Sequence, residues 1–271
     1  MPSMSAPPTI LVFDSGLGGL TVYREVVKVR PDARLIYALD DAFFPYGRRS
    51  EPVLVARVVD VMGEWIATHR PDLVVIACNT ASTLVLPQLR QRFQVPFVGT
   101  VPAIKPACAG SKTKLVSVLG TEATVGREYT RALIRDFAQG CNVTLVGSRR
   151  LAELAEAELK GERAADAAIA AELGPCFVEA EGRRTDTIVL ACTHYPLLLE
   201  RLQKLAPWPV HFIDPAPAIA RRVTDLLGPP ASSGPAPATG QVVFSSGNPP
   251  GPGLATALSQ FGLEARIPAG V

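Results

Sequence analysis

Residues 72–80 read DLVVIACNT, and residues 186–194 read DTIVLACTH. Each stretch carries an aspartate, an aliphatic run, an Ala-Cys pair and then two polar residues. Apolar runs of this length indicate strands that are buried on both faces of a parallel sheet. Ligands bind at the carboxyl ends of such strands, which is where Cys78 and Cys192 fall. The duplication therefore predicts two similar halves, each with one cysteine at the carboxyl edge of its sheet.

Short strands alternate with helices along the rest of the chain. Amphipathic helical patterns cover residues 53–69 and 152–181, the second divided near Gly161. The expected strands are Ile10–Phe13, Leu35–Leu39, Leu73–Ala77, Leu115–Leu119, Val143–Val146, Ile188–Ala191 and Val210–Ile213. This alternation predicts an α/β fold with two similar doubly wound parallel-sheet domains, related by pseudo-twofold symmetry, and an active site in the cleft between them.

Two short segments are the expected connections between these domains. Residues 98–102 (VGTVP) carry the chain into the second domain, and residues 207–209 (PWP) return it to the first. The first domain is thus expected to be discontinuous, with residues 9–99 plus 210–271, and the second to comprise residues 100–209.

Both ends of the chain and one late segment lack regular patterns. Residues 229–239 are rich in Pro, Ala, Ser and Gly and predict an exposed loop before a final strand at 242–244. Met1–Pro8 lacks the charged and apolar regions of a signal peptide, and polar residues interrupt the apolar run at 73–89. We therefore expect a cytoplasmic protein with no membrane span.

The overall composition limits the kinds of molecule that the protein is expected to bind. The 271 residues include 27 Lys and Arg against 25 Asp and Glu, a net charge of +2 without a basic cluster, so nucleic acid is not an expected partner. Hydrophobic residues make up 48% and aromatic residues 6%, which favours an aliphatic core. The five cysteines are an odd number without a secretory signal, so we expect them to be reduced.

A glycine-rich turn follows the first expected strand. Residues 14–19 read DSGLGG and open a helix, which is the context of a dinucleotide-binding fingerprint. The fingerprint fails because Thr21 stands where its third glycine belongs, and because Asp14 would face the pyrophosphate. A tight turn explains the glycines but not the polar pair Asp14-Ser15 at the ligand edge of the sheet, so we favour a functional role for this pair.

The segment after the second expected strand reads PYG at residues 45–47. Proline and glycine both favour turns, so an ordinary turn would explain them. Its place at the same sheet edge also suits a binding role, in which backbone N–H groups near Gly47 receive a carboxylate.

The two thiols carry the chemical argument. Cys108, Cys141 and Cys176 are expected to be small buried apolar residues. Cys78 and Cys192 differ, because a thiol between a strand end and a helix start lies in a field that favours thiolate, and a thiolate can act as a base. Their polar neighbours, Asn79-Thr80 and Thr193-His194, are suited to hydrogen bonding. His194 could be a cap or a general acid/base, and so could Asp14.

Four motifs now stand together in order: FDSGLGG at 13–19, PYG at 45–47, ACNTA at 77–81 and ACTHYP at 191–196. With them the chain, from about residue 10 to 223, closely resembles the glutamate racemase family. The resemblance implies two α/β domains around one active site and interconversion of L- and D-glutamate, which supplies D-glutamate for peptidoglycan synthesis. It implies no metal and no pyridoxal phosphate, and it leaves the oligomeric state open, a homodimer included.

The resemblance also assigns roles to residues. The catalytic pair would be Cys78 and Cys192, with Asp14 and His194 beside them and Glu156, rather than Glu153, as a carboxylate from the second domain. Substrate contacts would fall on Asp14, Ser15, Tyr46, Gly47, Asn79, Thr80, Thr193 and His194. This chain departs from the family pattern at Ala191 and Pro215, where glycine and serine are common.

Two thiols suit racemisation, because inverting a stereocentre requires a base on one face of the substrate and an acid on the other.

Two rival hypotheses remain for the function. One is a racemase for aspartate or a related amino acid with the same paired thiols. The other is a metal site made of Cys78, Cys192 and His194, which lacks an evident fourth ligand.

Overall fold

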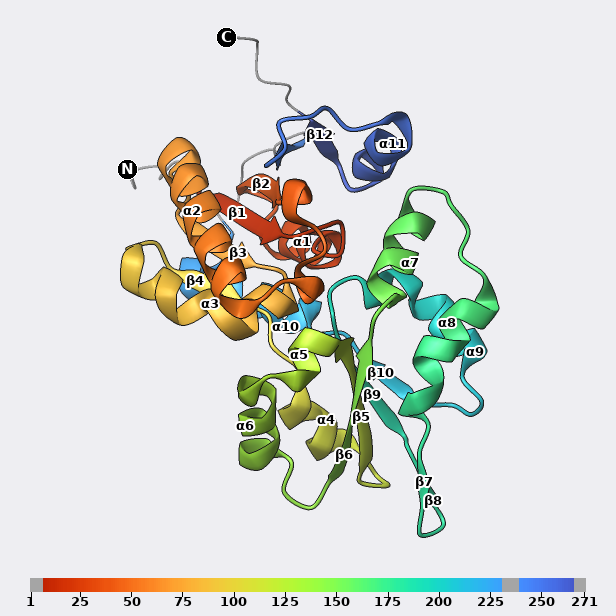
Figure 1. Ribbon diagram of the computed structural model, residues 1–271. Coiled ribbons are helices and arrows are strands. Elements are labelled where there is room, and N and C mark those ends of the chain that lie inside the picture. The colour runs from red at the N-terminus through yellow and green to blue at the C-terminus, as the bar shows by residue number, and fades with distance from the viewer. Residues whose placement is uncertain (1–6, 231–238, 266–271) are drawn as a thin grey trace.

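The computed structural model describes residues 7–230 and 239–265 and contains two parallel sheets (Figure 1). In the six-stranded sheet the order is β12 (Leu263–Ala265), β11 (Gly240–Phe244), β2 (Arg34–Leu39), β1 (Thr9–Asp14), β3 (Leu73–Ile76) and β4 (Phe97–Gly99). In the four-stranded sheet it is β10 (His211–Ile213), β9 (Thr187–Ala191), β5 (Leu115–Thr121) and β6 (Asn142–Ser148). We call the unit around the six-stranded sheet the first unit and the other the second unit.

Helices cover both faces of the first sheet, because its central strands are apolar on both sides. Ile10 and Val12 of β1 pack on one face, and Leu11 and Phe13 pack on the other. The first face is covered by α1 (Leu20–Val29), α10 (Ala216–Leu227) and α11 (Pro252–Gln260), and the second by α2 (Glu51–His69) and α3 (Asn79–Arg92). The short helices η1 (Asp41–Phe43) and η2 (Tyr46–Arg48) follow β2.

The second sheet is built in the same way. One face packs on α7 (Leu151–Leu159), α8 (Asp166–Leu173), η4 (Tyr195–Leu198) and α9 (Leu199–Leu205), and the other on α4 (Ile104–Gly110) and α6 (Glu128–Phe137). The short helix α5 (Glu122–Gly126) follows β5, and η3 (Gly174–Cys176) precedes an antiparallel hairpin of β7 (Glu179–Ala180) and β8 (Arg183–Arg184).

The two sheets share one strand order. The first contains β4-β3-β1-β2, and the second is β10-β9-β5-β6, so β3 corresponds to β9 and β1 to β5. Each cysteine-bearing strand therefore pairs with the first strand of its own unit. The α/β fold with two doubly wound parallel sheets is confirmed. In Figure 1 the first unit lies above the second, and α5 and α7 lie near the junction.

The return to the first unit comes later than the sequence indicated. Strand β10 pairs with β9 in the second sheet, so the chain crosses back after Ile213 rather than at residues 207–209. The Pro-Trp-Pro turn stays in the second unit, where Nε1 of Trp208 donates to the carbonyl of Thr185 at 2.8 Å. The first crossing, between β4 and α4, agrees with the expected segment.

Two other expectations change in detail. The helical pattern expected over 152–181 ends at Leu173, because the 3-10 turn η3 and the β7–β8 hairpin take up the rest. The strand expected at 242–244 is present as β11, but it is not the final one, because β12 follows it. Most of the loop expected at 229–239 lies outside the described residues. Within the described ranges, no helix has both the length and the apolar character needed to cross a bilayer.

Candidate active site

Asp14 ends β1 at the carboxyl edge of the first sheet and is fully buried. Its carboxylate accepts hydrogen bonds from the backbone N–H groups of Ser15, at 2.6 Å, and Gly19. Thr193, from the second unit, donates its hydroxyl to the same carboxylate at 3.3 Å. Burial raises the pKa of Asp14, while His194 and the two N–H groups oppose that rise. Asp14 therefore closes the glycine-rich turn and reaches across the junction.

The glycines of that turn allow the second unit to approach closely. A Cβ at Gly16 would collide with the carboxylate of Glu156 and the ring of Phe44, and one at Gly18 would collide with His194. Apart from Phe44, the atoms that fill the space beside these two glycines belong to Glu156 and His194 of the second unit. These glycines thus serve close packing between the units rather than binding of a pyrophosphate.

Cys78 lies directly between β3 and α3, as expected, and is the N-cap residue of α3. Its sulfur lies 3.7 Å from the hydroxyl of Ser15, which in turn lies 3.4 Å from Oδ1 of Asp14. The thiol is only 6% exposed, and burial followed by the charge of Asp14 raises its pKa. Burial and the charge of Asp14 therefore oppose the thiolate that the field of the helix terminus favours at Cys78.

Cys192 follows β9 at the equivalent edge of the second sheet. It precedes a turn and the 3-10 helix η4, not an α-helix, so the helix start expected there is absent. Its sulfur lies instead 3.7 Å from Nδ1 of His194. The histidine, rather than a helix terminus, is the positive group next to this thiol.

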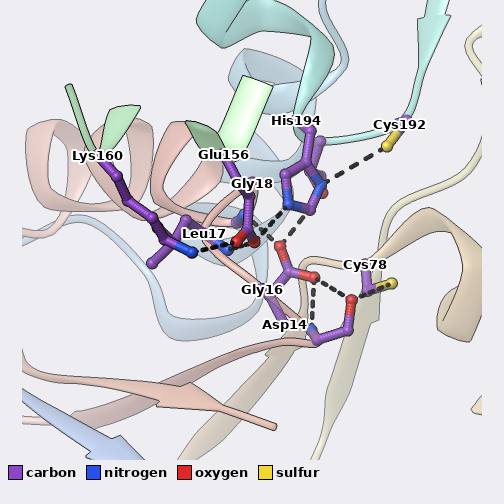
Figure 2. A network of polar contacts seen from close by, with 12 residues as sticks. Asp14, Gly16, Leu17, Gly18, Cys78, Glu156, Lys160, Cys192 and His194 are labelled. Carbon is purple, nitrogen blue, oxygen red and sulfur yellow. Dashed lines mark hydrogen bonds and ion pairs between the residues drawn. The ribbon is translucent and has the colours of Figure 1, made fainter. Parts of the chain in front are cut away.

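His194 and Glu156 form a buried pair, with Nε2 3.0 Å from Oε1 (Figure 2). Burial alone would lower the pKa of His194, but hydrogen bonds to Cys192 and Glu156 raise it well above its usual value. Burial would raise the pKa of Glu156, but His194 lowers it to about 2. The raised pKa of His194 and the lowered pKa of Glu156 both favour an imidazolium beside a carboxylate. Glu153, the alternative, instead pairs with Arg48 at 2.6 Å near the surface.

Tyr46 is buried after β2, but its hydroxyl donates to Oδ2 of Asp40 at 2.5 Å. Arg57 on α2 donates to the same carboxylate at 2.6 Å. Burial would raise the pKa of Asp40, but Arg57 and other hydrogen-bond donors hold it below its usual value. Gly47 lies against Thr121 of the second unit. Tyr46 is therefore oriented by a partly buried ion pair.

The polar residues after Cys78 differ in their contacts. Asn79 is 2% exposed, and neither its side-chain oxygen nor its nitrogen has a partner. Thr80 reaches the second unit, where its hydroxyl lies 3.1 Å from that of Thr121 and 3.3 Å from that of Thr124. An unpaired buried amide is costly unless a ligand satisfies it. The side chain of Asn79 therefore has both a free donor and a free acceptor at this site.

Sequence reasoning missed several residues of this assembly. Asp40 follows β2 at the same sheet edge as Asp14, so the strand-end rule could have identified it. Thr121 ends β5, the counterpart of β1, and Thr124 lies in α5 directly after it. Arg127, which contacts α3 from the second unit, carries no sequence signal that distinguishes it from a surface arginine.

The carboxyl edges of the two sheets therefore meet at one assembly. Figure 2 shows Cys192 next to His194 and Cys78 near Asp14, with the two cysteines on different segments of the chain. The two sulfurs lie within electrostatic reach of each other. Among the described residues, no three His, Cys, Asp or Glu side chains are grouped so that they could hold a metal ion.

The sequence is similar to known proteins over most of its length. The sequence model of the Asp/Glu/Hydantoin racemase family matches residues 10–223. The glutamate racemase of Brucella anthropi is 56% identical over 230 residues, which is 84% of this chain and 83% of the relative.

Solved structures show the same fold. Escherichia coli glutamate racemase, in complex with L-glutamate and the activator UDP-MurNAc-ala, aligns with a TM-score of 0.84 and 41% identity over 96% of this chain and 97% of that one. The Aquifex pyrophilus glutamate racemase aligns with a TM-score of 0.70 and 27% identity over 93% and 94%. An aspartate racemase homologue from Pyrococcus horikoshii reaches only 0.50 and 20% over 81% and 98%, a likeness in fold alone.

Proposed function

The chain belongs to the Asp/Glu/Hydantoin racemase family and is a racemase of the glutamate type, and we propose that it interconverts L- and D-glutamate with Cys78 and Cys192 as its two acid/base groups. The carrying observation is that the two thiols stand at equivalent strand ends, β3 and β9, of sheets with the same strand order. A thiol from each unit can then address opposite faces of one α-carbon.

On the second-unit side, Cys192 takes the α-proton from L-glutamate. His194 lies 3.7 Å from its sulfur and is held protonated by Glu156, so a positive charge is available to stabilise negative charge on that sulfur. Glu156 also fixes the imidazole through the bond at 3.0 Å. His194 therefore assists Cys192 without leaving its place between thiol and carboxylate.

On the first-unit side, Cys78 is the acid when L-glutamate is converted to D-glutamate. Its raised pKa keeps the proton on sulfur until the substrate carbanion forms on the opposite side. Ser15 connects the sulfur to Asp14, whose own pKa is raised, so this carboxylate can take part in reprotonating the thiol. In the reverse direction the roles exchange, and Cys78 takes the proton from D-glutamate.

The substrate needs polar contacts for its charged groups. Asn79 supports this role, because its buried amide has both a donor and an acceptor without partners. The other proposed contacts, at Ser15, Tyr46, Gly47, Thr80, Thr193 and His194, surround the same junction. Cys78 and Cys192 are each 6% exposed, so the two units must separate for glutamate to enter.

We assign the product to peptidoglycan synthesis. D-glutamate is a building block of that polymer, and the Escherichia coli relative has an activator, UDP-MurNAc-ala, that contains muramic acid, another of its building blocks. A cytoplasmic location suits a supplier of such precursors. The role is tested by asking whether depletion of the protein makes growth depend on added D-glutamate.

The activity is tested with pure protein and no added cofactor. Each enantiomer of glutamate and of aspartate is supplied separately, and the circular dichroism of the amino acid is followed. We expect the glutamate signals to decay to zero, and Cys78→Ser and Cys192→Ser to abolish the decay. Faster racemisation of aspartate than of glutamate would favour the rival substrate, and an active single serine variant would reject the two-thiol mechanism.

A further inference from the structure

Arg127 bridges the two units, and its guanidinium is buried. The residue lies between α5 and α6 of the second unit, and its side chain is 6% exposed. Its Nη1 donates to the carbonyl oxygen of Thr80 and, at 3.0 Å, to Oγ1 of Thr83. Its Nε lies 3.3 Å from Oε1 of Glu51. All three partners belong to the first unit.

This burial is costly, because the charge is only partly paired. The Nε atom is buried and makes no hydrogen bond, and Glu51 is 60% exposed, so its charge is screened by water. Burial lowers the pKa of Arg127, while Glu51 and Cys78 oppose that fall. An apolar side chain would fill the position without this desolvation cost. The position is thus better explained by a use for its charge and its donors than by packing.

The contacts of Arg127 lead directly to Cys78. Helix α3 begins immediately after the cysteine, and Thr80 lies in its first turn. The N–H of Ser82 donates to the carbonyl of Cys78 at 2.8 Å, so this turn and the cysteine backbone move together. The hydroxyl of Thr80 also contacts Thr121 of the second unit at 3.1 Å. Arg127 therefore holds the element that aims the thiol.

We propose that Arg127 is a positioning residue for Cys78: it fixes the first turn of α3 against the second unit and supplies a positive charge that stabilises the thiolate whenever Cys78 gives up its proton. This inference rests on the proposed role of Cys78 as a reacting thiol. It adds to that role a group on the other unit that acts through α3 and through its charge, without touching the substrate.

The other titratable groups around the thiol make such a cation important. Those that interact electrostatically with Cys78 are Asp14 at the end of β1, Cys192 after β9, Tyr37 on β2 and Tyr46 in η2. Each of them is neutral or negative. Asp14 in its charged form opposes the thiolate, whereas Arg127 favours it. Removing the guanidinium leaves Cys78 with its opposing neighbours and without this support.

The test compares Arg127→Met and Arg127→Lys with Arg131→Met in the full-length protein. Arg131 is a matched control on α6, because its side chain is 57% exposed and reaches Glu128 only at 4.0 Å. Alkylation of Cys78 by iodoacetamide is measured against pH by peptide mass spectrometry, with Cys192 in the same sample as the internal reference. The kcat and KM for each glutamate enantiomer are measured in parallel.

The alkylation midpoint is the pH at which the alkylation rate of a thiol is half its maximum. For Arg127→Met we expect the midpoint of Cys78 to rise by about one pH unit relative to that of Cys192. We also expect kcat to fall roughly tenfold, with a smaller change in KM. Arg127→Lys should restore most of the midpoint, because the charge is kept, but less of kcat, because lysine lacks the planar guanidinium whose Nη1 donates to both Thr80 and Thr83. Arg131→Met should match the wild type in all three measurements.

An unchanged Cys78 midpoint together with a kcat within about twofold of the wild type in Arg127→Met would overturn the proposal. If that variant does not fold, Arg127→Lys is compared with Arg131→Lys. A lower kcat of Arg127→Lys at an unchanged Cys78 midpoint supports the role of Arg127 in positioning the first turn of α3, and an unchanged kcat rejects it. Alkylation does not require turnover, so the effect of the substitution on the Cys78 thiol is measured independently of racemase activity. A fully active Cys78→Ser would instead refute the proposed function itself.

Discussion

Glu156 accepts a hydrogen bond from the backbone N–H of Leu17 at 2.8 Å, although the two residues belong to different units of the fold. The same oxygen lies 3.0 Å from Nε2 of His194, and Lys160 binds the other carboxylate oxygen at 3.0 Å. One carboxylate thus joins the loop after β1, helix α7 and the segment after Cys192. Changes at Glu156 should therefore affect the histidine, the junction and the stability together.

Replacing Glu156 with glutamine should lower kcat by roughly ten- to a hundredfold, because His194 loses the charge that keeps it protonated. The pKa of His194 should fall, and the activity should be lost at a lower pH than in the wild type. The pH profile of kcat and the NMR titration of the imidazole measure both effects. Glu153→Gln is the matched control on the same helix, since Glu153 pairs with Arg48 near the surface. Equal effects of the two changes would contradict this role.

The Glu156–His194 pair should also make stability depend on pH. The folded-state pKa of Glu156 is lowered from 4.5 to about 2, so its contribution is present above pH 4.5 and is lost as the pH falls through about 2. The pKa of His194 is raised from 6.5, so its contribution is complete below pH 6.5 and is lost as the pH rises through its folded value. The stability advantage over Glu156→Gln should therefore peak between these limits, on the order of 3 kcal/mol.

Urea unfolding of the wild type and Glu156→Gln at pH 3, 5.5 and 9 measures this advantage. We expect the difference in unfolding free energy to be largest at pH 5.5. A difference that is constant over the three pH values would show that the pair is not ionised in the folded protein.

Gly16→Ala should reduce activity more than tenfold, because the new methyl group would press on the carboxylate of Glu156 and the ring of Phe44. The substitution should separate Glu156 from Leu17 and displace His194. Kinetic assays and thermal melting are compared with those of Gly110→Ala, where a Cβ meets no atom within 4 Å. A Gly16→Ala enzyme with wild-type kcat would mean that this close approach is dispensable.

In deuterated water, solvent deuterium should enter mainly the newly formed enantiomer during the first turnovers. The thiol that removes the proton retains it, while the opposite thiol delivers deuterium from solvent. Starting from L-glutamate, Cys78 should deliver the label, and starting from D-glutamate, Cys192 should do so. Proton NMR of the recovered enantiomers measures the α-hydrogen content. Early deuterium in substrate and product alike would point to a single exchanging base.

The alternation of strands and helices and the place of the two thiols could be predicted from the sequence. Buried parallel strands need uninterrupted apolar runs, and the runs before Cys78 and Cys192 are nearly copies, so pattern alone located two equivalent strand ends. The position of Glu156 came from resemblance, because a carboxylate on an ordinary helix carries no local signal. Its choice over Glu153 agrees with the contacts of the two side chains.

Tertiary structure alone decided how the thiols are tuned and how the units meet. The sequence placed Cys78 before a helix start, but its pKa depends on burial and on Asp14, which only the packed chain brings near. Strand β10 follows a proline-rich turn that looked like a crossing, and its partner β9 is chosen by pairing rather than by composition. In the sequence Arg127 cannot be distinguished from a surface arginine, and only the folded chain brings it into contact with α3. Strand periodicity is local and is written in the sequence, whereas desolvation and charge proximity depend on contacts between distant segments.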